Sequence, residues 1–116
     1  MIFETHAHYD DKMFDEDRES LLESMQEAGI GRIVNIGADL ASTASSIALA
    51  EKYPFIYAAA GVHPSDAAQL NEHTFQWLSE QTAHEKVVAV GEIGLDYYWE
   101  KDPEVRANQR YWFRRQ

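Results

Sequence analysis

Residues 87–98 read VVAVGEIGLDYY, a short apolar run that passes directly into a polar cluster. The same order recurs along the chain, and its four apolar runs are Met1–Thr5, Arg32–Gly37, Phe55–Ala60 and Lys86–Val90. The runs begin 23 to 32 residues apart when counted from Ile2, Arg32, Phe55 and Val87. This spacing is typical of successive βα units, and nearly continuous valine, isoleucine and alanine favour strands covered on both faces. The sequence therefore predicts an α/β fold with four parallel strands.

Amphipathic segments separate the apolar runs and are expected to form helices. The acidic residues 15–17 favour a helix start, and Gly29 is expected directly after the end of that helix. Asp39 is expected to cap a second helix that stops at Tyr53-Pro54. The inward-facing residues predicted for these two helices are Leu21, Leu22, Met25, Ala28, Ala44, Ile47, Ala48 and Ala50.

Two further helices complete the pattern. The third is expected within Glu72–Gln81, packing Phe75 and Leu78, and the fourth is expected to begin near Pro103-Glu104 and to reach Gln116 without a capping glycine. Four strands and four helices in this order predict the first half of a parallel eight-stranded (β/α)8 barrel. Residues 1–116 are thus expected to be the N-terminal half of one barrel domain, ending within its fourth helix. A small open parallel sheet is the alternative architecture.

Composition limits the function. The chain has 20 acidic and 10 basic residues, a net charge of −10, which repels phosphate and excludes nucleic-acid binding by general charge attraction. A phosphorylated substrate therefore needs local cations, either metal ions or a small arginine cluster. The chain has no cysteine, which excludes disulfides and thiolate chemistry. We expect a cytoplasmic location and no membrane partner, because no apolar stretch is long enough to span a bilayer.

The strongest local motif is His6-Ala7-His8, at the end of the first expected strand. Side chains two positions apart on a strand point to one face, so both imidazoles are expected to converge. Neutral imidazole is a common ligand of divalent transition metals. Taken alone, the motif is a weak signal, and two loop histidines that cap a strand are the commoner interpretation.

Polar clusters at two other strand ends strengthen the metal interpretation. Gly61-Val62-His63-Pro64 follows the third run, and Gly91 to Asp96 follow the fourth. Parallel strands of a barrel share one mouth, so His6, His8, His63, Glu92 and Asp96 are expected to line one cavity. The Glu92 carboxylate has the chemistry needed to bridge two metal ions. The alternative is that the glycines only permit a sharp turn and leave Glu92 solvated.

Three motifs, ETHAHYDD at residues 4–11, AGVHPSD at 60–66 and VVAVGEIGLDYY at 87–98, resemble the TatD-type metal-dependent hydrolases, barrel enzymes related to the amidohydrolases. The resemblance covers essentially the whole chain. It implies divalent metal ions, two of Mg, Mn or Zn, with ligands His6 and His8 and a catalytic, metal-bridging Glu92. It also implies that His63 is a catalytic histidine that touches substrate phosphate.

The activity implied by the resemblance is hydrolysis of DNA phosphodiesters by a metal-activated water. Glu4 stands where the family usually carries aspartate, and we expect it to orient the His6 imidazole. The family's remaining two histidine ligands and its late aspartate belong to the second half of the barrel, and no residue here replaces them. The chain alone is therefore expected to be inactive. The partners predicted are DNA or another phosphodiester, with self-association through exposed strand edges or pairing with a C-terminal half.

Other residues allow two interpretations each. Asp96 and Tyr97 are predicted to contact substrate, and the run Tyr97 to Trp99 either stacks on unpaired bases or packs over the barrel rim. The remaining candidates are Asp10 and Asp11, as metal neighbours or turn formers; Arg106, Arg110 and Arg114, as a DNA contact or as partners of acidic helices; and His73 and His84, as surface residues. Alternative functions are another amidohydrolase-type ester or amide hydrolysis, or an inactive half-barrel that self-associates or binds a partner.

Overall fold

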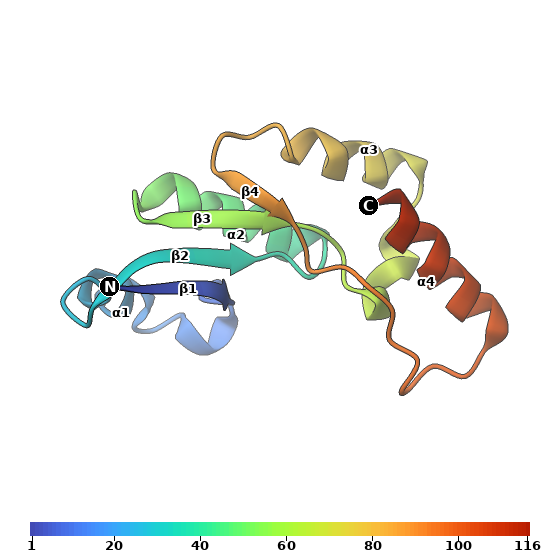
Figure 1. The fold of residues 1–116 in the computed structure, drawn as a ribbon, viewed down its shortest axis with the longest axis horizontal. Coiled ribbons are helices and arrows are strands. Elements are labelled where there is room, and N and C mark those ends of the chain that lie inside the picture. Colours follow the sequence, from blue (N-terminus) through green and yellow to red (C-terminus); the bar gives the residue numbers. More distant parts are fainter.

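Four parallel strands form one open sheet at the centre of the molecule (Figure 1). The computed structural model describes residues 1–116, and the strands are β1 (Ile2–Ala7), β2 (Ile30–Ile36), β3 (Ile56–Ala60) and β4 (Val87–Val90). Their order in the sheet, β1-β2-β3-β4, is also their order in the chain. The prediction of successive parallel βα units is therefore confirmed. β1 and β4 each have one unpaired edge within the chain.

The helices follow the strands as expected. They are α1 (Arg18–Ser24), α2 (Leu40–Lys52), α3 (Glu72–Gln81) and α4 (Pro103–Arg115), and two short 3-10 helices, η1 (Lys12–Phe14) and η2 (Pro64–Gln69), were not anticipated. Asp39 caps α2 through its side chain, which accepts a hydrogen bond of 2.6 Å from the Ser42 N–H. None of these helices combines the length and the apolar character needed to cross a membrane.

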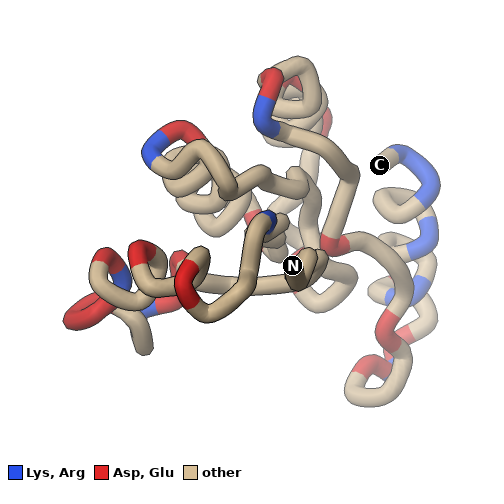
Figure 2. Tube along the Cα trace, turned by 60° about the vertical axis from the view of Figure 1, so that its left-hand side comes forward, with Lys and Arg blue, Asp and Glu red and all other residues tan.

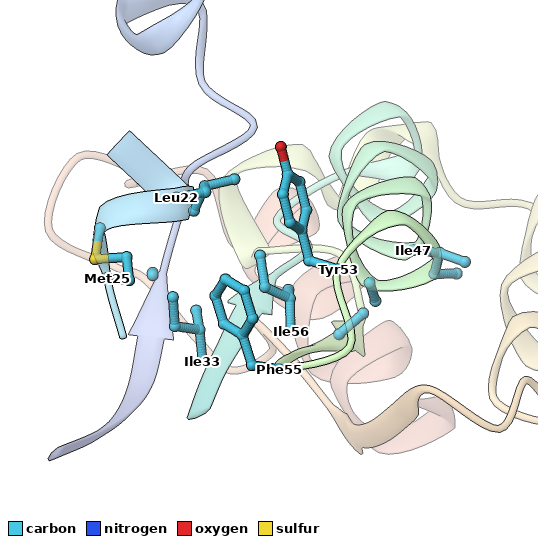
Figure 3. Packing of buried hydrophobic residues seen from close by; sticks show 10 residues of the cluster. Leu22, Met25, Ile33, Ile47, Tyr53, Phe55 and Ile56 are labelled. Carbon is cyan, nitrogen blue, oxygen red and sulfur yellow. The ribbon is translucent and has the colours of Figure 1, made fainter. Parts of the chain in front are cut away.

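Both faces of the sheet carry buried apolar side chains. The larger cluster packs Leu22 of α1 and Ile47 of α2 against Ile33 and Ile56 of the central strands (Figure 3). A separate small cluster is formed by Val34, Ile36 and Ala59, the alternate positions of the same strands. Because neighbouring side chains on a strand point to opposite faces, this second cluster lies on the face away from α1 and α2. Burial on both faces explains the apolar runs of β2 and β3. The expectation of two covered faces is wrong for the edge strands β1 and β4, most of whose residues are exposed.

α1 ends at Ser24 and turns follow as far as Gly29, so the helix ends earlier than the sequence predicted. Gly29 has a φ of +87°, in the left-handed region that favours glycine. The N–H groups of Gly29 and Ile30 donate to the carbonyls of Gln26 and Met25, at 3.0 and 2.9 Å. This pair of hydrogen bonds is a Schellman motif, which ends the helical path after α1.

The predicted inward faces of α1 and α2 need correction. Three alanines expected to face inward are exposed: Ala28, Ala44 and Ala48. Thr43 and Ser46 are fully buried on α2 in their place. The Thr43 hydroxyl donates to the Gly61 carbonyl at 3.0 Å, and the Ser46 hydroxyl accepts from the Asn35 amide at 2.8 Å. Partnered hydroxyl groups can be buried without a desolvation penalty, so α2 turns this polar stripe inward.

α3 and α4 pack against each other beside the sheet. Leu78 of α3 is buried, and the rings of Phe75 and Trp112 lie 5.6 Å apart between their centroids. The Arg115 guanidinium donates to the Glu72 carboxylate at 2.7 Å, and this contact lowers the pKa of Glu72. The predicted spans of both helices, and the packing of Phe75 and Leu78, are confirmed.

The arginine stripe of α4 does not pair with acidic helices as the sequence suggested. Arg106 donates to the carbonyls of Tyr97 and Glu100, and Arg110 donates to the Tyr97 hydroxyl at 3.0 Å. The ion pair to α3 comes instead from Arg115. Arg106 and Arg110 therefore contact the segment that joins β4 to α4, which forms a loop at the start of α4 (Figure 1).

Candidate metal centre

Two histidines and one glutamate converge above the ends of the strands. His6 lies in β1, His8 directly follows it, and Glu92 follows β4. One ligand atom from each of the three lies within 4.8 Å of the others. His6 Nε2 is 3.8 Å from Glu92 Oε2, and the two imidazole centroids are 5.0 Å apart. The structure therefore brings together the three residues for which the sequence predicted a common role as ligands.

β1 and β4 are at opposite edges of the sheet, so a crossing of the chain is needed to join them. After β4 the Gly91 N–H donates to the Ala60 carbonyl, and the Glu92 N–H donates to the Gly37 carbonyl beyond the end of β2. The segment thus passes over the ends of β3 and β2 toward His6. Glu92 remains 35% exposed in its side chain, which is neither fully solvated nor enclosed.

Gly61 makes this crossing possible. A Cβ placed on Gly61 would lie 2.5 Å from the carbonyl carbon of Gly91, closer than side chains are found. Only glycine therefore lets the end of β3 meet the Gly91-Glu92 backbone. The alternative interpretation, in which the glycines only permit a sharp turn, does not explain this close approach of Gly61 to Gly91.

The His8 ring is held in one orientation. His8 Nδ1 is 3.1 Å from the Ile36 carbonyl oxygen, which can only accept a hydrogen bond. The neutral ring therefore carries its proton on Nδ1, and Nε2 keeps a free lone pair. Metal-binding histidines are commonly held by a backbone carbonyl in this way.

Asn35, which the sequence analysis did not single out, fixes the loop that carries His8. Its side chain is fully buried, and its Oδ1 accepts a hydrogen bond of 2.7 Å from the Tyr9 N–H. Its Nδ2 donates to Asp10 Oδ1 and Ser46 Oγ, both at 2.8 Å. An asparagine inside an otherwise apolar run is a sequence signal for a buried polar side chain, but it does not identify the residues to which that side chain bonds.

Asp10 and Asp11 fit the interpretation as turn formers. Asp10 accepts from Asn35, and Asp11 caps η1 by accepting 2.8 Å from the Met13 N–H. Arg18 secures the same loop, since its guanidinium donates to the carbonyls of Tyr9, Asp10 and Asp11. Neither carboxylate joins the cluster of His6, His8 and Glu92.

Glu4 contacts His6 differently from the expectation. Its Oε1 accepts a hydrogen bond of 3.0 Å from the backbone N–H of His6, so the carboxylate holds the backbone and not the imidazole. A backbone N–H two residues along is within easy reach of a glutamate side chain. Burial and the nearby Glu4 charge together raise the pKa of Tyr9.

His63 lies outside the cluster of converging ligand atoms. Its Nδ1 accepts a hydrogen bond of 3.1 Å from the Ser65 N–H and so caps η2. In the neutral ring this contact places the proton on Nε2, which becomes a donor. A donor of this kind suits a phosphate oxygen better than a metal ion.

Asp96 and Tyr97 are tied to α4. The Asp96 N–H and carbonyl pair with the Gln109 amide at 2.9 and 3.0 Å. The Tyr97 ring lies under the Arg106 guanidinium, 4.6 Å from its centroid. Both residues therefore lie outside the cluster, and Tyr97 packs against α4.

The donor set suits a divalent transition metal. Two imidazoles and one carboxylate are borderline and hard ligands, the combination that zinc, manganese and related ions accept. The donor atoms of His6, His8 and Glu92 lie close enough together to share an ion, within 4.8 Å of one another.

This chain is similar in sequence to known proteins. The model of the family described as TatD related DNase matches residues 3–116. The uncharacterized metal-dependent hydrolase YabD of Bacillus subtilis (strain 168) is 45% identical over 103 residues, which cover 89% of this chain and 40% of that protein. The 3'-5' ssDNA/RNA exonuclease TatD of Pectobacterium carotovorum subsp. carotovorum (strain PC1) is 31% identical over 97 residues, 83% of this chain and 37% of that protein.

A solved structure shares the fold. The crystal structure of YjjV, a TatD homolog from Escherichia coli K12, matches 97% of this chain and 44% of its own with a TM-score of 0.83 and 34% identity. The chain spans about two fifths of the length of the curated relatives it matches. The structural similarity to YjjV supports the parallel α/β fold. The similarity to YabD relates the chain to a metal-dependent hydrolase. From the match over residues 3–116, the chain belongs to the TatD related DNase family.

Proposed function

We propose that His6, His8 and Glu92 bind divalent metal, two ions when the site is complete, and that the site hydrolyses DNA phosphodiesters. The observation that carries this proposal is the convergence of the three ligand atoms within 4.8 Å. The relatives support it, since YabD is named a metal-dependent hydrolase and TatD a single-strand DNA and RNA exonuclease. A cytoplasmic location remains a prediction of the same kind.

Each residue has a defined task in the proposed reaction. His8 presents Nε2 because Ile36 holds its other nitrogen, and Glu92 offers two oxygens at the point that His6 faces. His63 Nε2–H donates to a non-bridging phosphate oxygen and so orients the phosphodiester. Glu4 holds the backbone of His6. A divalent ion bound there supplies Lewis-acid polarisation of the phosphate and lowers the pKa of water.

Three ligands are few for a site of two ions. We therefore propose that the 116-residue chain binds metal weakly and cleaves DNA slowly at most. Correct positioning of reactants contributes about 7–11 kcal/mol to lowering a barrier. A site with three metal ligands and one hydrogen-bond donor to the phosphate is expected to position its substrate poorly.

Metal binding is tested by titrating the chain with Mn²⁺ and with Zn²⁺ by calorimetry. The His6→Ala, His8→Ala double variant is expected to lose binding, and His73→Ala, an exposed histidine on α3, is the matched control and should bind as the original chain does. Circular dichroism verifies that the variants fold. Equal binding by the double variant and the original chain would exclude this site.

Hydrolysis is tested with end-labelled single-stranded DNA and Mn²⁺. Little or no cleavage is expected from this chain, and any cleavage that does occur should disappear with EDTA and in Glu92→Ala. Cleavage that continues unchanged in Glu92→Ala would show that another centre, or a contaminant, performs the reaction.

A further inference from the structure

Two exposed aromatic rings follow β4 and have no role in the metal centre. Trp99 is 82% exposed and Tyr98 is 71% exposed, and their centroids are 4.5 Å apart with the rings nearly perpendicular. The preceding Tyr97 packs under Arg106 of α4, whereas Tyr98 and Trp99 have no such contact with a helix. Large exposed aromatic rings that sit together mark binding surfaces more often than isolated exposed residues do.

The segment that carries the rings is held in place at both ends. The Tyr98 N–H donates to Asp96 Oδ1 at 3.1 Å, and Arg106 donates to the Tyr97 and Glu100 carbonyls at 3.1 and 2.7 Å. The backbone is therefore arranged before any ligand arrives. A preorganised aromatic surface loses little conformational entropy when it binds.

A cavity of about 430 Å³ adjoins Trp99, between η2 and α4. Its other walls include four acidic residues, Asp96, Glu100, Asp102 and Glu104. Four carboxylates repel phosphate, but carboxylate oxygens accept hydrogen bonds from the exocyclic amino groups of bases. Figure 2 shows acidic residues around this turn and basic residues farther along α4.

The cavity is also close to the residue proposed to hold phosphate. η2 begins directly after His63, and Pro64 and Ser65 of η2 line the cavity. The cavity therefore adjoins the turn that carries His63, the proposed phosphate contact. Because the net charge of −10 disfavours phosphate contacts elsewhere, base contacts must supply much of the affinity.

We propose that Trp99 and this cavity form a subsite for one unpaired nucleobase of the substrate. The base stacks on the indole, and an amino-bearing base such as cytosine donates to the cavity carboxylates. This proposal rests on the proposed function only in taking a nucleic acid as the ligand. It makes the subsite selective for single strands, because a paired base in a duplex presents no free face.

The test uses the 116-residue chain in EDTA and measures the fluorescence anisotropy of labelled oligonucleotides. The probes are an oligo-dC, an oligo-dT of equal length and an abasic strand with the same number of phosphates. We expect binding to decrease in that order. Trp99→Ala should weaken oligo-dC binding about tenfold, and Trp99→Phe should restore most of it because a ring remains.

Two control variants separate this subsite from other effects. Phe113→Ala removes an exposed ring of α4 that does not line the cavity, and it should bind as the original chain does. The His6→Ala, His8→Ala variant should also bind normally in EDTA, so failure of the metal site and failure of the subsite are distinguishable. Absent oligo-dC binding, equal binding of the abasic strand, or unchanged binding by Trp99→Ala would overturn the subsite. Equal affinity for oligo-dC and oligo-dT would overturn the role of the carboxylates.

Discussion

Replacing Asn35 by alanine is expected to weaken both the fold and the metal centre. Asn35 lies fully buried in β2 and connects it to two other parts of the chain. Its side-chain amide accepts a hydrogen bond from the Tyr9 N–H after β1 and donates one to Ser46 of α2. A third hydrogen bond, to Asp10, holds the same loop. The alanine variant removes all three hydrogen bonds and leaves the buried Ser46 hydroxyl without its partner.

The magnitude follows from these contacts. A neutral hydrogen bond contributes about 0.5–1.5 kcal/mol net, and a buried group left without a partner costs about 1–3 kcal/mol. Relaxation and water entry offset part of this loss, so we expect Asn35→Ala to lower the free energy of unfolding by about 2–4 kcal/mol. Small domains have about 5–15 kcal/mol in total. The variant should therefore still fold, with a clearly lower denaturation midpoint.

Urea denaturation followed by circular dichroism measures this change at one fixed protein concentration. Asn108→Ala, in α4, is the matched control and should change the unfolding free energy by less than about 0.5 kcal/mol. Mn²⁺ titration of the folded Asn35→Ala variant should show weaker binding, because Tyr9 directly follows His8. A loss of stability below about 1 kcal/mol, or unchanged metal affinity, would refute the role assigned to Asn35.

Three further predictions concern other parts of the molecule. Gly61→Ala should lower both stability and metal affinity, because its Cβ would lie 2.5 Å from the Gly91 carbonyl carbon; unchanged thermal unfolding and metal titration would contradict this. Arg115 lowers the pKa of Glu72, so their ion pair stabilises the fold at neutral pH and its contribution is lost as the pH falls through the lowered pKa. Thermal melts should therefore show Glu72→Gln less stable than the original chain at neutral pH, with the difference shrinking as the pH falls into the acid range, and a constant difference would refute the assignment. Finally, the unpaired edges of β1 and β4 should lead the chain to self-associate as its concentration rises; light scattering that reports a 13.3 kDa monomer at every concentration would contradict this.

The elements of the fold could be predicted because their signals are local. Apolar runs placed all four strands, and Asp39 and Pro103 marked the starts of α2 and α4 through their own backbone and side-chain chemistry. Convergence of His6, His8 and Glu92 was also predictable, since parallel strands present their carboxyl ends at one side of a sheet.

The buried polar contacts were not predictable because they join residues far apart in the chain. Asn35 bonds to Tyr9 across 26 residues, and Thr43 bonds to Gly61 across 18. Hydrophobic periodicity treats these residues as polar and places them outside the core. Their burial becomes favourable only when the tertiary structure supplies the partner. For the same reason the alanines of α2 were assigned inward in place of Thr43.

β2 contributes no ligand, yet its end sets the geometry of the metal centre. The carbonyl oxygen of Ile36, the last residue of β2, accepts from the His8 ring, and the next carbonyl, that of Gly37, accepts from the Glu92 N–H. Two consecutive peptide groups therefore hold ligands that come from opposite edges of the sheet. Peptide carbonyls are present at every residue, so no sequence motif marks these two as special. A small shift of β2 along its neighbours would displace His8 and Glu92 together, which makes the register of the sheet a determinant of metal affinity.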